Sequence, residues 1–157
     1  MPDSKGPYNF TEEVGSALED ARSVAVAASS PCVQPIHVLH SLLKGAEAAR
    51  VLSPLVQLVA LRTAVATSIG AAPRARTRPN DIYSSGCLRV LQNAMAEARG
   101  IGHSFVGAEH LLLGILRTTP KRRLFWILPP SPDPAYAVLV AMGVTYDVLR
   151  ATVGRAA

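Results

Sequence analysis

Aromatic residues, cysteines and long apolar runs are all scarce in this 157-residue chain. Aromatics make up 5% of it, against 49% for all hydrophobic residues, so the core must be built mainly from Ala, Val and Leu. Such a core favours closely packed helices over a sheet rich in aromatic and β-branched residues. No uninterrupted apolar run approaches the ~18 residues of a membrane-spanning helix. The composition therefore predicts one compact, mainly helical domain without a membrane span.

The two cysteines, Cys32 and Cys87, show neither a CxxC pair nor any other spacing typical of a metal site. We interpret them as reduced thiols that pack in the core, as in a cytoplasmic protein. Residues 1–7 are polar and lack the apolar centre of a signal peptide. The preference for Arg over Lys and the many alanines are typical of bacteria with GC-rich genomes. The sequence therefore predicts a cytoplasmic, bacterial protein.

Sequence signatures of catalysis are missing as well. The chain has no G-x-x-x-x-G-K-[ST] phosphate loop, so ATP hydrolysis is not expected. No serine lies in a G-x-S-x-G turn, and no set of nucleophile, base and orienting residue is recognisable. We predict a protein that is not an enzyme and that uses no cofactor and no metal.

The strongest positive signal is an internal repeat. Residues 10–43 align without a gap on residues 83–116, and every matched pair is 73 positions apart. The identical pairs are Leu18/Leu91, Ala21/Ala94, Ala25/Ala98, Val33/Val106, His37/His110, Leu39/Leu112 and Leu43/Leu116. A repeat of this kind is one supersecondary unit whose apolar face is buried against its copy.

Capping residues and apolar stripes predict four helices in each copy. The first helix follows the N-cap Thr11 in copy one and starts at Ser84 or Ser85 in copy two. Each ends in a turn, at 29–31 and at 100–102. The later helices are expected at 35–44, 47–52 and 55–68, and at 107–117, 135–142 and 145–153. The predicted fold class is all-α, with about eight helices in two four-helix repeats around a pseudo-twofold axis.

The domain boundaries follow from the same alignment. Leu52 matches Leu139 at a separation of 87 positions, which is 14 more than in the rest of the repeat and marks an insertion. We expect a flexible N-terminus at 1–9 and a single domain at 10–157. Within it lie repeat one at 10–69, a linker at 70–82 and repeat two at 83–153, with the insert at 118–134.

Three motifs of repeat two carry a family resemblance: Tyr83-Ser84-Ser85, Glu97-Ala98-Arg99 and the thirteen residues from Gly102 to Gly114. They resemble the N-terminal repeat domain of the Clp/Hsp100 unfoldases, particularly the ClpC type. Weaker matches to the same family occur in repeat one, at 10–12 and 37–39. The resemblance covers about residues 10–153, without linker and insert. It implies an all-helical pseudo-twofold domain that recruits substrates or adaptors, here as a stand-alone domain without the ATPase modules.

The resemblance also implies binding residues. In some ClpC members, the glutamate matched by Glu109 holds the guanidinium of phosphoarginine, and Ser84 would be the matching hydroxyl for the phosphate. Tyr83 matches an aromatic position of the surface that certain cyclic-peptide antibiotics bind. Phe10 and Thr11 occupy the positions of Tyr83 and Ser84 in repeat one and join the expected binding residues.

Other interpretations of these residues remain open. Glu109 also suits a first-turn position, where a carboxylate stabilises the helix dipole. Repeat one has Ile36 in place of the glutamate, and isoleucine cannot bind guanidinium, so at most one phosphoarginine pocket is expected. His37 and His110 recur at the repeat spacing without a metal-ligand pattern. We predict that both are buried and hydrogen-bonded to backbone, and that His103 is a structural loop residue.

Two basic clusters and one apolar segment complete the candidates. Arg74/Arg76/Arg78 and Lys121–Arg123 lie in predicted loops and suit solvated charge or, alternatively, nucleic acid. Phe125 and Trp126 lie in the apolar stretch 124–128, which suits a lid over the domain, an anchor for a partner, or a membrane-surface contact.

We therefore predict a non-catalytic binding domain of a Clp protease system, acting as an adaptor, a decoy or a sequestering protein. Its expected partners are a Clp unfoldase, or the substrates and adaptors of one, and cyclic-peptide antibiotics. The alternative is a basic nucleic-acid-binding protein.

Overall fold

The computed structural model describes residues 9–71, 81–117 and 133–156, which form eight helices and two two-residue strands. Repeat one holds β1 (Asn9–Phe10), α1 (Glu12–Ala27), α2 (Pro35–Leu42), α3 (Ala46–Leu52) and α4 (Leu58–Ala71). Repeat two holds α5 (Ser85–Ile101), β2 (Phe105–Val106), α6 (Ala108–Arg117), α7 (Pro134–Ala141) and α8 (Tyr146–Ala156). The predicted all-α class with four helices in each repeat is confirmed.

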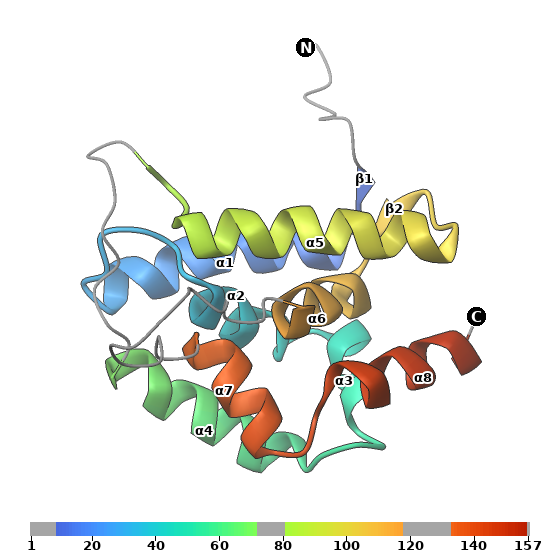
Figure 1. The fold of residues 1–157 in the computed structure, drawn as a ribbon. Coiled ribbons are helices and arrows are strands. Elements are labelled where there is room, and N and C mark those ends of the chain that lie inside the picture. The colour runs from blue at the N-terminus through green and yellow to red at the C-terminus, as the bar shows by residue number, and fades with distance from the viewer. Residues whose placement is uncertain (1–8, 72–80, 118–132, 157) are drawn as a thin grey trace, which may run out of the picture.

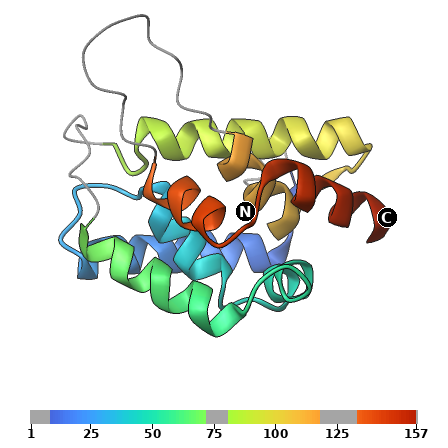
Figure 2. The same ribbon diagram turned by 60° about the horizontal axis from the view of Figure 1, so that its bottom comes forward.

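The helices lie in layers (Figures 1 and 2). The long first helices α1 and α5 run side by side, the short α2 and α6 pack beneath them, and the remaining helices cover the other side of α2 and α6. α1 packs on α2 in the same way that α5 packs on α6. The second helices therefore occupy the centre of the domain, where they are almost completely buried.

The third helix of each repeat packs against the other repeat. α3 packs on α6 and α8 of repeat two, and α7 packs on α2 and α4 of repeat one. The contacts of α3 with repeat two thus have counterparts in those of α7 with repeat one, as a pseudo-twofold axis requires. Neither repeat has a complete core without its partner.

The segments that lead into the first helices are exchanged as well. β1 pairs in parallel with β2, with Phe10 opposite Val106, and the Thr11 amide donates to the Val106 carbonyl over 3.1 Å. At the equivalent place Val33 pairs with Tyr83, and the Ser84 amide donates to the Val33 carbonyl over 2.9 Å. Each first helix therefore starts beside the second helix of the other repeat.

The predicted helix caps are confirmed. Thr11 accepts from the Val14 amide and Ser84 from the Cys87 amide, so both residues cap their helices from repeat-equivalent positions. The chain is left-handed after α1 at Ser29, with φ of 53°, and at the equivalent Gly102, with φ of 84°. Only glycine adopts this backbone readily, so the turn in repeat one is the more strained of the two.

The fourth helix of repeat one differs from its predicted bounds. It begins at Leu58 instead of position 55, because the amides of Leu55 and Val56 both bond to the Leu52 carbonyl in a turn. It also continues to Ala71, into the segment expected as linker. Elsewhere the helices start and end within a few residues of the prediction.

The core contains the small aliphatic residues that the composition predicted. Its buried hydrophobic side chains are Ala, Val, Leu, Ile and Cys, and no aromatic side chain of the described residues is fully buried. Cys32 and Cys87 are buried as thiols. Burial raises the pKa of Cys87 to about 12, which keeps this thiol protonated and unreactive.

Several sequence candidates lie outside the described residues. These are the arginines at 74, 76 and 78, the basic residues 121–123, and the two aromatics of the insert, Phe125 and Trp126. In the described part of the chain, no helix taken singly is long and apolar enough to cross a membrane, and only α7 and α8 together, bent by 75°, pass that test.

Candidate functional site

The structure divides the expected binding residues between the two ends of α5 (Figure 1). Tyr83 and Ser84 lie at its N-terminal end, next to Val33. Phe10 and Thr11 lie at the other end beside β2, which leads into Glu109 and α6. Because α5 has 17 residues, the two groups are separated by about 25 Å. The structure therefore does not bring Glu109 and Ser84 together, since the exchange of leading segments places Thr11 beside the start of α6 instead.

Glu109 lines a pocket at the junction of the two repeats, which we name the seam pocket. Its volume is about 330 Å³. It is formed by Arg50 and Val51 of α3, His103 and Phe105 before α6, Glu109, and Thr152 and Val153 of α8. The pocket thus combines one carboxylate, one guanidinium and an aromatic ring, and it exists only because α3 of repeat one crosses onto repeat two.

Glu109 is positioned by its place in the first turn of α6 and by the small residue before it. Its side chain is 14% exposed, and Oε1 lies 3.6 Å from Nδ1 of His110. The carboxylate folds back over Gly107, where an added Cβ would lie 2.6 Å from Oε2. Gly107 therefore leaves the space into which the carboxylate turns.

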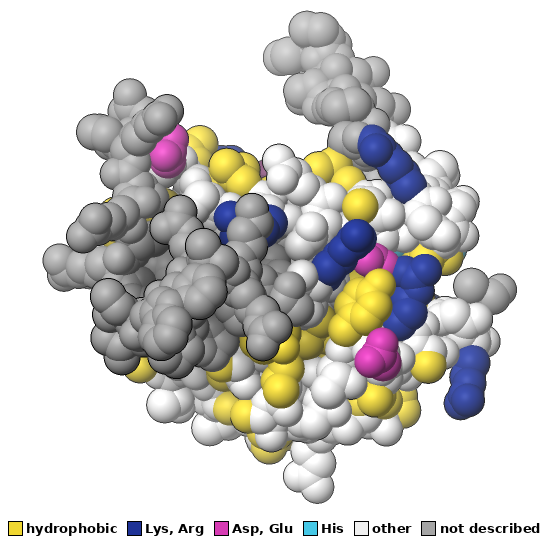
Figure 3. Space-filling model, in the orientation of Figure 1, with side chains coloured by type: hydrophobic (Ala, Val, Ile, Leu, Met, Phe, Trp, Pro, Cys, Tyr) yellow, Lys and Arg dark blue, Asp and Glu magenta, His cyan; other side chains and the backbone are white. Residues whose placement is uncertain are grey.

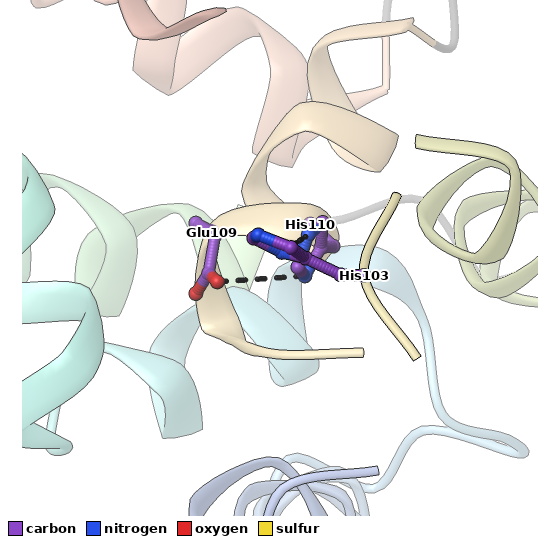
Figure 4. A group of neighbouring side chains, drawn as sticks. All are labelled: His103, Glu109 and His110. Atoms are coloured by element: carbon purple, nitrogen blue, oxygen red, sulfur yellow. Dashed lines mark hydrogen bonds and ion pairs between the residues drawn. The ribbon is translucent and has the colours of Figure 1, made fainter. Parts of the chain in front are cut away.

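Behind Glu109, two histidines form a short relay (Figure 4). The Gly107 amide donates to Nδ1 of His110 over 2.9 Å, which leaves the His110 proton on Nε2, 3.0 Å from Nδ1 of His103. The His103 ring stacks on Phe105, with 5.1 Å between centroids. Burial lowers the pKa of His110 and keeps its ring neutral. The relay fixes the loop that carries Phe105.

The histidine prediction is confirmed in both repeats. His37 and His110 are buried, and Nδ1 of each accepts from the backbone amide three residues earlier, at Gln34 and Gly107 respectively. His103 stabilises its loop through a hydrogen bond to His110. The two histidines at the repeat spacing are thus structural residues that hold the start of each second helix.

His103, Glu109 and His110 each offer a possible metal-ligand atom, and these atoms lie within 4.8 Å of one another. Metal-bound imidazole coordinates through one nitrogen and carries a proton on the other. In His110 the Gly107 amide already occupies Nδ1 as a donor, so Nε2 must keep the proton. A cation at this place would break the bond that holds the α6 start, and the arrangement therefore does not fit a metal.

Two further carboxylates hold the helix starts around the seam pocket. The Ala108 amide and the Thr11 hydroxyl both donate to Oε2 of Glu47, each over 3.2 Å. Glu13 in turn accepts from the amides of Ala46, Glu47 and Ala48 at the start of α3. The Ala108 amide at the α6 N-terminus is thus bound to Glu47, and Arg50 is a cation that lines the pocket.

A comparison with protein families identifies the family of this chain. Residues 9–125 match the family model described as the Clp repeat (R) N-terminal domain. The chain belongs to this family. An uncharacterized protein of Mycobacterium tuberculosis is 32% identical over 120 residues, which cover 74% of this chain and 46% of the relative. The negative regulator of genetic competence ClpC/MecB of Bacillus subtilis is 32% identical over 112 residues, 69% of this chain and 14% of that protein.

The solved structures agree with the Clp fold. The Hsp104 N-terminal domain from Candida albicans superposes with a TM-score of 0.69 at 16% identity, covering 92% of this chain and 88% of that one. The N-terminal domain of ClpD from Arabidopsis thaliana gives 0.60 at 20% identity, covering 92% and 94%. The chain thus has the fold of a Clp N-terminal domain, a fold consistent with protein interaction. It spans less than half the length of the curated relatives named above.

Among the described residues at the other end of α5, the position equivalent to Glu109 holds no carboxylate. Tyr83 is half-buried, with the Arg22 guanidinium 5.6 Å from its ring centroid and donating to its hydroxyl over 3.4 Å. Ser84 is buried as a helix cap. Ile36, the counterpart of Glu109, is completely buried in the core.

Sequence reasoning missed Arg50 and Glu47, which belong to the seam. Both lie on α3, a seven-residue helix whose sequence carries no mark of its contact with repeat two. The only signal available was the repeat itself, because a paired repeat implies that some element crosses between the copies.

Proposed function

We propose that this chain is a non-catalytic protein- or peptide-binding domain of a cytoplasmic Clp protease system, and that it binds its partner at the seam pocket. The observation that carries the proposal is the position of Glu109, a partly exposed carboxylate in a pocket of about 330 Å³ that also presents Arg50 and Phe105. Membership of the Clp N-terminal family supports a role in protein recruitment.

The ligand chemistry that suits the seam pocket is a phosphoarginine side chain on a tagged protein. A carboxylate accepts two parallel hydrogen bonds from a guanidinium, and an arginine binds a phosphate in the same bidentate manner. Glu109 and Arg50 supply these two groups from α6 and α3. The buried Ile36 leaves repeat one without a carboxylate at the equivalent position, so one such side chain is bound per domain.

Isothermal titration calorimetry with a short phosphoarginine peptide, and with its arginine counterpart, tests this proposal. Glu109→Gln should weaken binding of both peptides about tenfold or more, because it removes a charge-assisted bidentate contact. Arg50→Gln should weaken only the phosphorylated peptide. Glu12→Gln is the matched control, since Glu12 is an exposed first-turn carboxylate of α1 that lies outside the pocket. Glu109→Gln with wild-type affinity would contradict the proposal.

The same variants separate the biological roles. The chain is added to a ClpC–ClpP protease that degrades a phosphoarginine-tagged substrate. A decoy that sequesters the tag slows degradation, and an adaptor accelerates it; Glu109→Gln should abolish either effect. An unchanged rate with the wild-type chain contradicts both roles.

A subsidiary proposal concerns the Tyr83 end of α5, which corresponds by resemblance to the surface for cyclic-peptide antibiotics. There the ring of Tyr83 lies against Arg22 and is half-buried. We expect micromolar or tighter binding of such a peptide in calorimetry, weakened by Tyr83→Ala and unaffected by Glu109→Gln. A folded sample that releases no heat at high peptide concentration contradicts it.

A further inference from the structure

A second pocket lies in repeat two, formed by α5, α6 and α8. Its volume is about 740 Å³, and its lining includes Glu97 and Gly100 of α5, Leu116 and Arg117 of α6, and Tyr146 and Arg150 of α8. It shares no lining residue with the seam pocket. Figure 3 shows basic side chains beside acidic and hydrophobic ones on this part of the surface, between α5 and α8.

A buried carboxylate organises this second pocket. The Glu97 side chain is 3% exposed, and its oxygens accept from Nη1 of Arg117 over 2.9 Å, from the Tyr146 hydroxyl over 3.0 Å, and from Nη1 of Arg150. Burial, together with the bond to Glu97, raises the pKa of Tyr146, so its hydroxyl remains a donor. Glu97 thereby ties α5 to α6 and α8.

The two arginines carry more charge and more donors than Glu97 uses. Each guanidinium has five N–H groups, and toward the described residues Arg117 and Arg150 each donate through Nη1 alone. Two cations against one carboxylate leave one positive charge in excess. Their side chains remain 51% and 39% exposed, so the remaining donors are accessible at the pocket. Because Glu97 already fixes both, an anion that binds them orders little that was free before.

The repeat fold does not require this cluster. In repeat one the positions of Glu97 and Arg117 hold Val24 and Lys44, and the alignment at the later offset matches Arg150 to Thr63. Lys44 there pairs with Asp20 over 2.6 Å at the surface. Since the same packing position is filled by an apolar residue, the buried carboxylate with two arginines is a feature of repeat two beyond its fold.

We propose that this second pocket binds the carboxylate of an acidic peptide, either at its C-terminus or on an Asp or Glu side chain, between Arg117 and Arg150. Guanidinium groups bind a carboxylate in a bidentate manner. The half-buried Tyr146 ring supplies apolar surface for the adjoining residues of the peptide, and the volume accommodates more than a free ion. The proposal goes beyond the function of the seam pocket, because it concerns other residues.

Amide NMR titration of the ¹⁵N-labelled chain tests the proposal with four acetylated tripeptides. They are Ala-Ala-Asp amide, with a side-chain carboxylate only, Ala-Ala-Ala acid, with a C-terminal carboxylate only, the doubly charged Ala-Ala-Asp acid, and the neutral Ala-Ala-Ala amide. Shifts of the Ala96, Gly100 and Tyr146 amides with a charged peptide support the proposal, and the first two peptides identify the source of the carboxylate. No shift, equal shifts with the neutral peptide, or shifts with inorganic phosphate alone overturn it.

Substitutions of single arginines test whether the peptide binds at Arg117. Arg117→Gln should weaken binding about tenfold. Arg155→Gln is the matched control, because Arg155 is exposed on the last turn of α8 and does not line the pocket. Arg117→Lys keeps the charge without the planar fork, so an intermediate affinity is expected even where Arg117→Gln fails to fold. A folded Arg117→Gln with wild-type affinity, or an equal loss in Arg155→Gln, overturns the proposal.

Discussion

In repeat two, Glu109 lies in the first turn of α6 with 14% of its side chain exposed, whereas its counterpart in repeat one, Ile36, is completely buried. The same contrast holds at a second position, where repeat two buries Glu97 under two arginines and repeat one has Val24. The helix caps and the buried histidines are shared. The repeats therefore agree in what the fold requires and differ in the charged groups that are available for binding.

This difference also shows how a duplicated unit can have the carboxylate of the seam pocket in only one of its halves. The crossing of α3 brings Arg50 onto repeat two, beside Glu109. The symmetric crossing of α7 packs onto α2, where the position equivalent to Glu109 is the buried Ile36. In repeat one the turn after α1 borders a smaller hollow, of about 190 Å³, lined by Ser29, Ser30, Gln34 and His37 among others. Helix α3 of repeat one thus completes the seam pocket of repeat two.

The largest expected effect comes from exchanging the residues where the second helix meets the first. Gly114 of α6 lies against α5, and an added Cβ would stand 2.6 Å from the Val90 carbonyl oxygen. Its counterpart in repeat one is Ser41, whose hydroxyl donates to Asp20 over 2.7 Å. Gly114→Ser should lower the free energy of unfolding by roughly 3 kcal/mol, because the contact is with backbone.

Urea denaturation measures this change, and Gly15→Ala is its control. Gly15 lies inside α1 with nothing within 4 Å of an added Cβ. Alanine there should stabilise the domain by about 0.5–1 kcal/mol, through helix propensity. A Gly114→Ser variant as stable as the wild type would show that α5 and α6 do not approach as closely as described.

The next largest effect concerns the ion pairs, whose removal should cost more stability in repeat two than in repeat one. Glu97→Gln removes a buried charge that two arginines face, and we expect a loss of about 2 kcal/mol. Asp20→Asn in repeat one removes the charge that faces Lys44 at the surface but keeps an oxygen that can accept from Ser41, so the expected loss is ~0.5 kcal/mol. Urea denaturation of both variants at low and high salt tests the comparison. Equal losses would contradict the distinction drawn between the repeats.

The turns after the first helices give a smaller effect. Ser29 adopts a left-handed backbone with φ of 53°, which its counterpart Gly102 adopts without strain. Ser29→Gly should raise the free energy of unfolding by about 0.5–1 kcal/mol, and Gly102→Ser should lower it by about 1 kcal/mol. Thermal unfolding of the two variants checks the signs; destabilisation by Ser29→Gly would refute the strain.

The smallest effect is a dependence on pH that both repeats share. Burial lowers the pKa of His37 and of His110 from the ordinary value of 6.5. Below pH 6.5 the unfolded chain then binds more protons than the folded one, so stability falls as the pH is lowered through this window and is constant above it. His110→Asn and His37→Asn, which keep an acceptor near Nδ1, should each reduce the slope of unfolding free energy between about pH 5 and about pH 6.5. If neither substitution changed the slope, the conclusion that His37 and His110 are uncharged in the folded chain would be contradicted.

Much of the fold could be predicted from the sequence, because the repeat and the caps are local signals. Thr11, Ser84 and Gly102 marked the helix ends, and His37 with His110 fixed the register of the copies. The site could be predicted only in part. Glu109 was found through its motif, but its partner Arg50 comes from a helix of the other repeat. No local pattern encodes that crossing, nor the distance that the structure places between Glu109 and Ser84.

The most direct test is to locate a bound phosphoarginine peptide by amide NMR. Shifts confined to Arg50, Phe105, Glu109 and Thr152, absent in Glu109→Gln, are the expected result, because these residues line the seam pocket. Shifts centred on Ser29, Ser30 and Gln34 of repeat one would contradict a binding site that only repeat two completes.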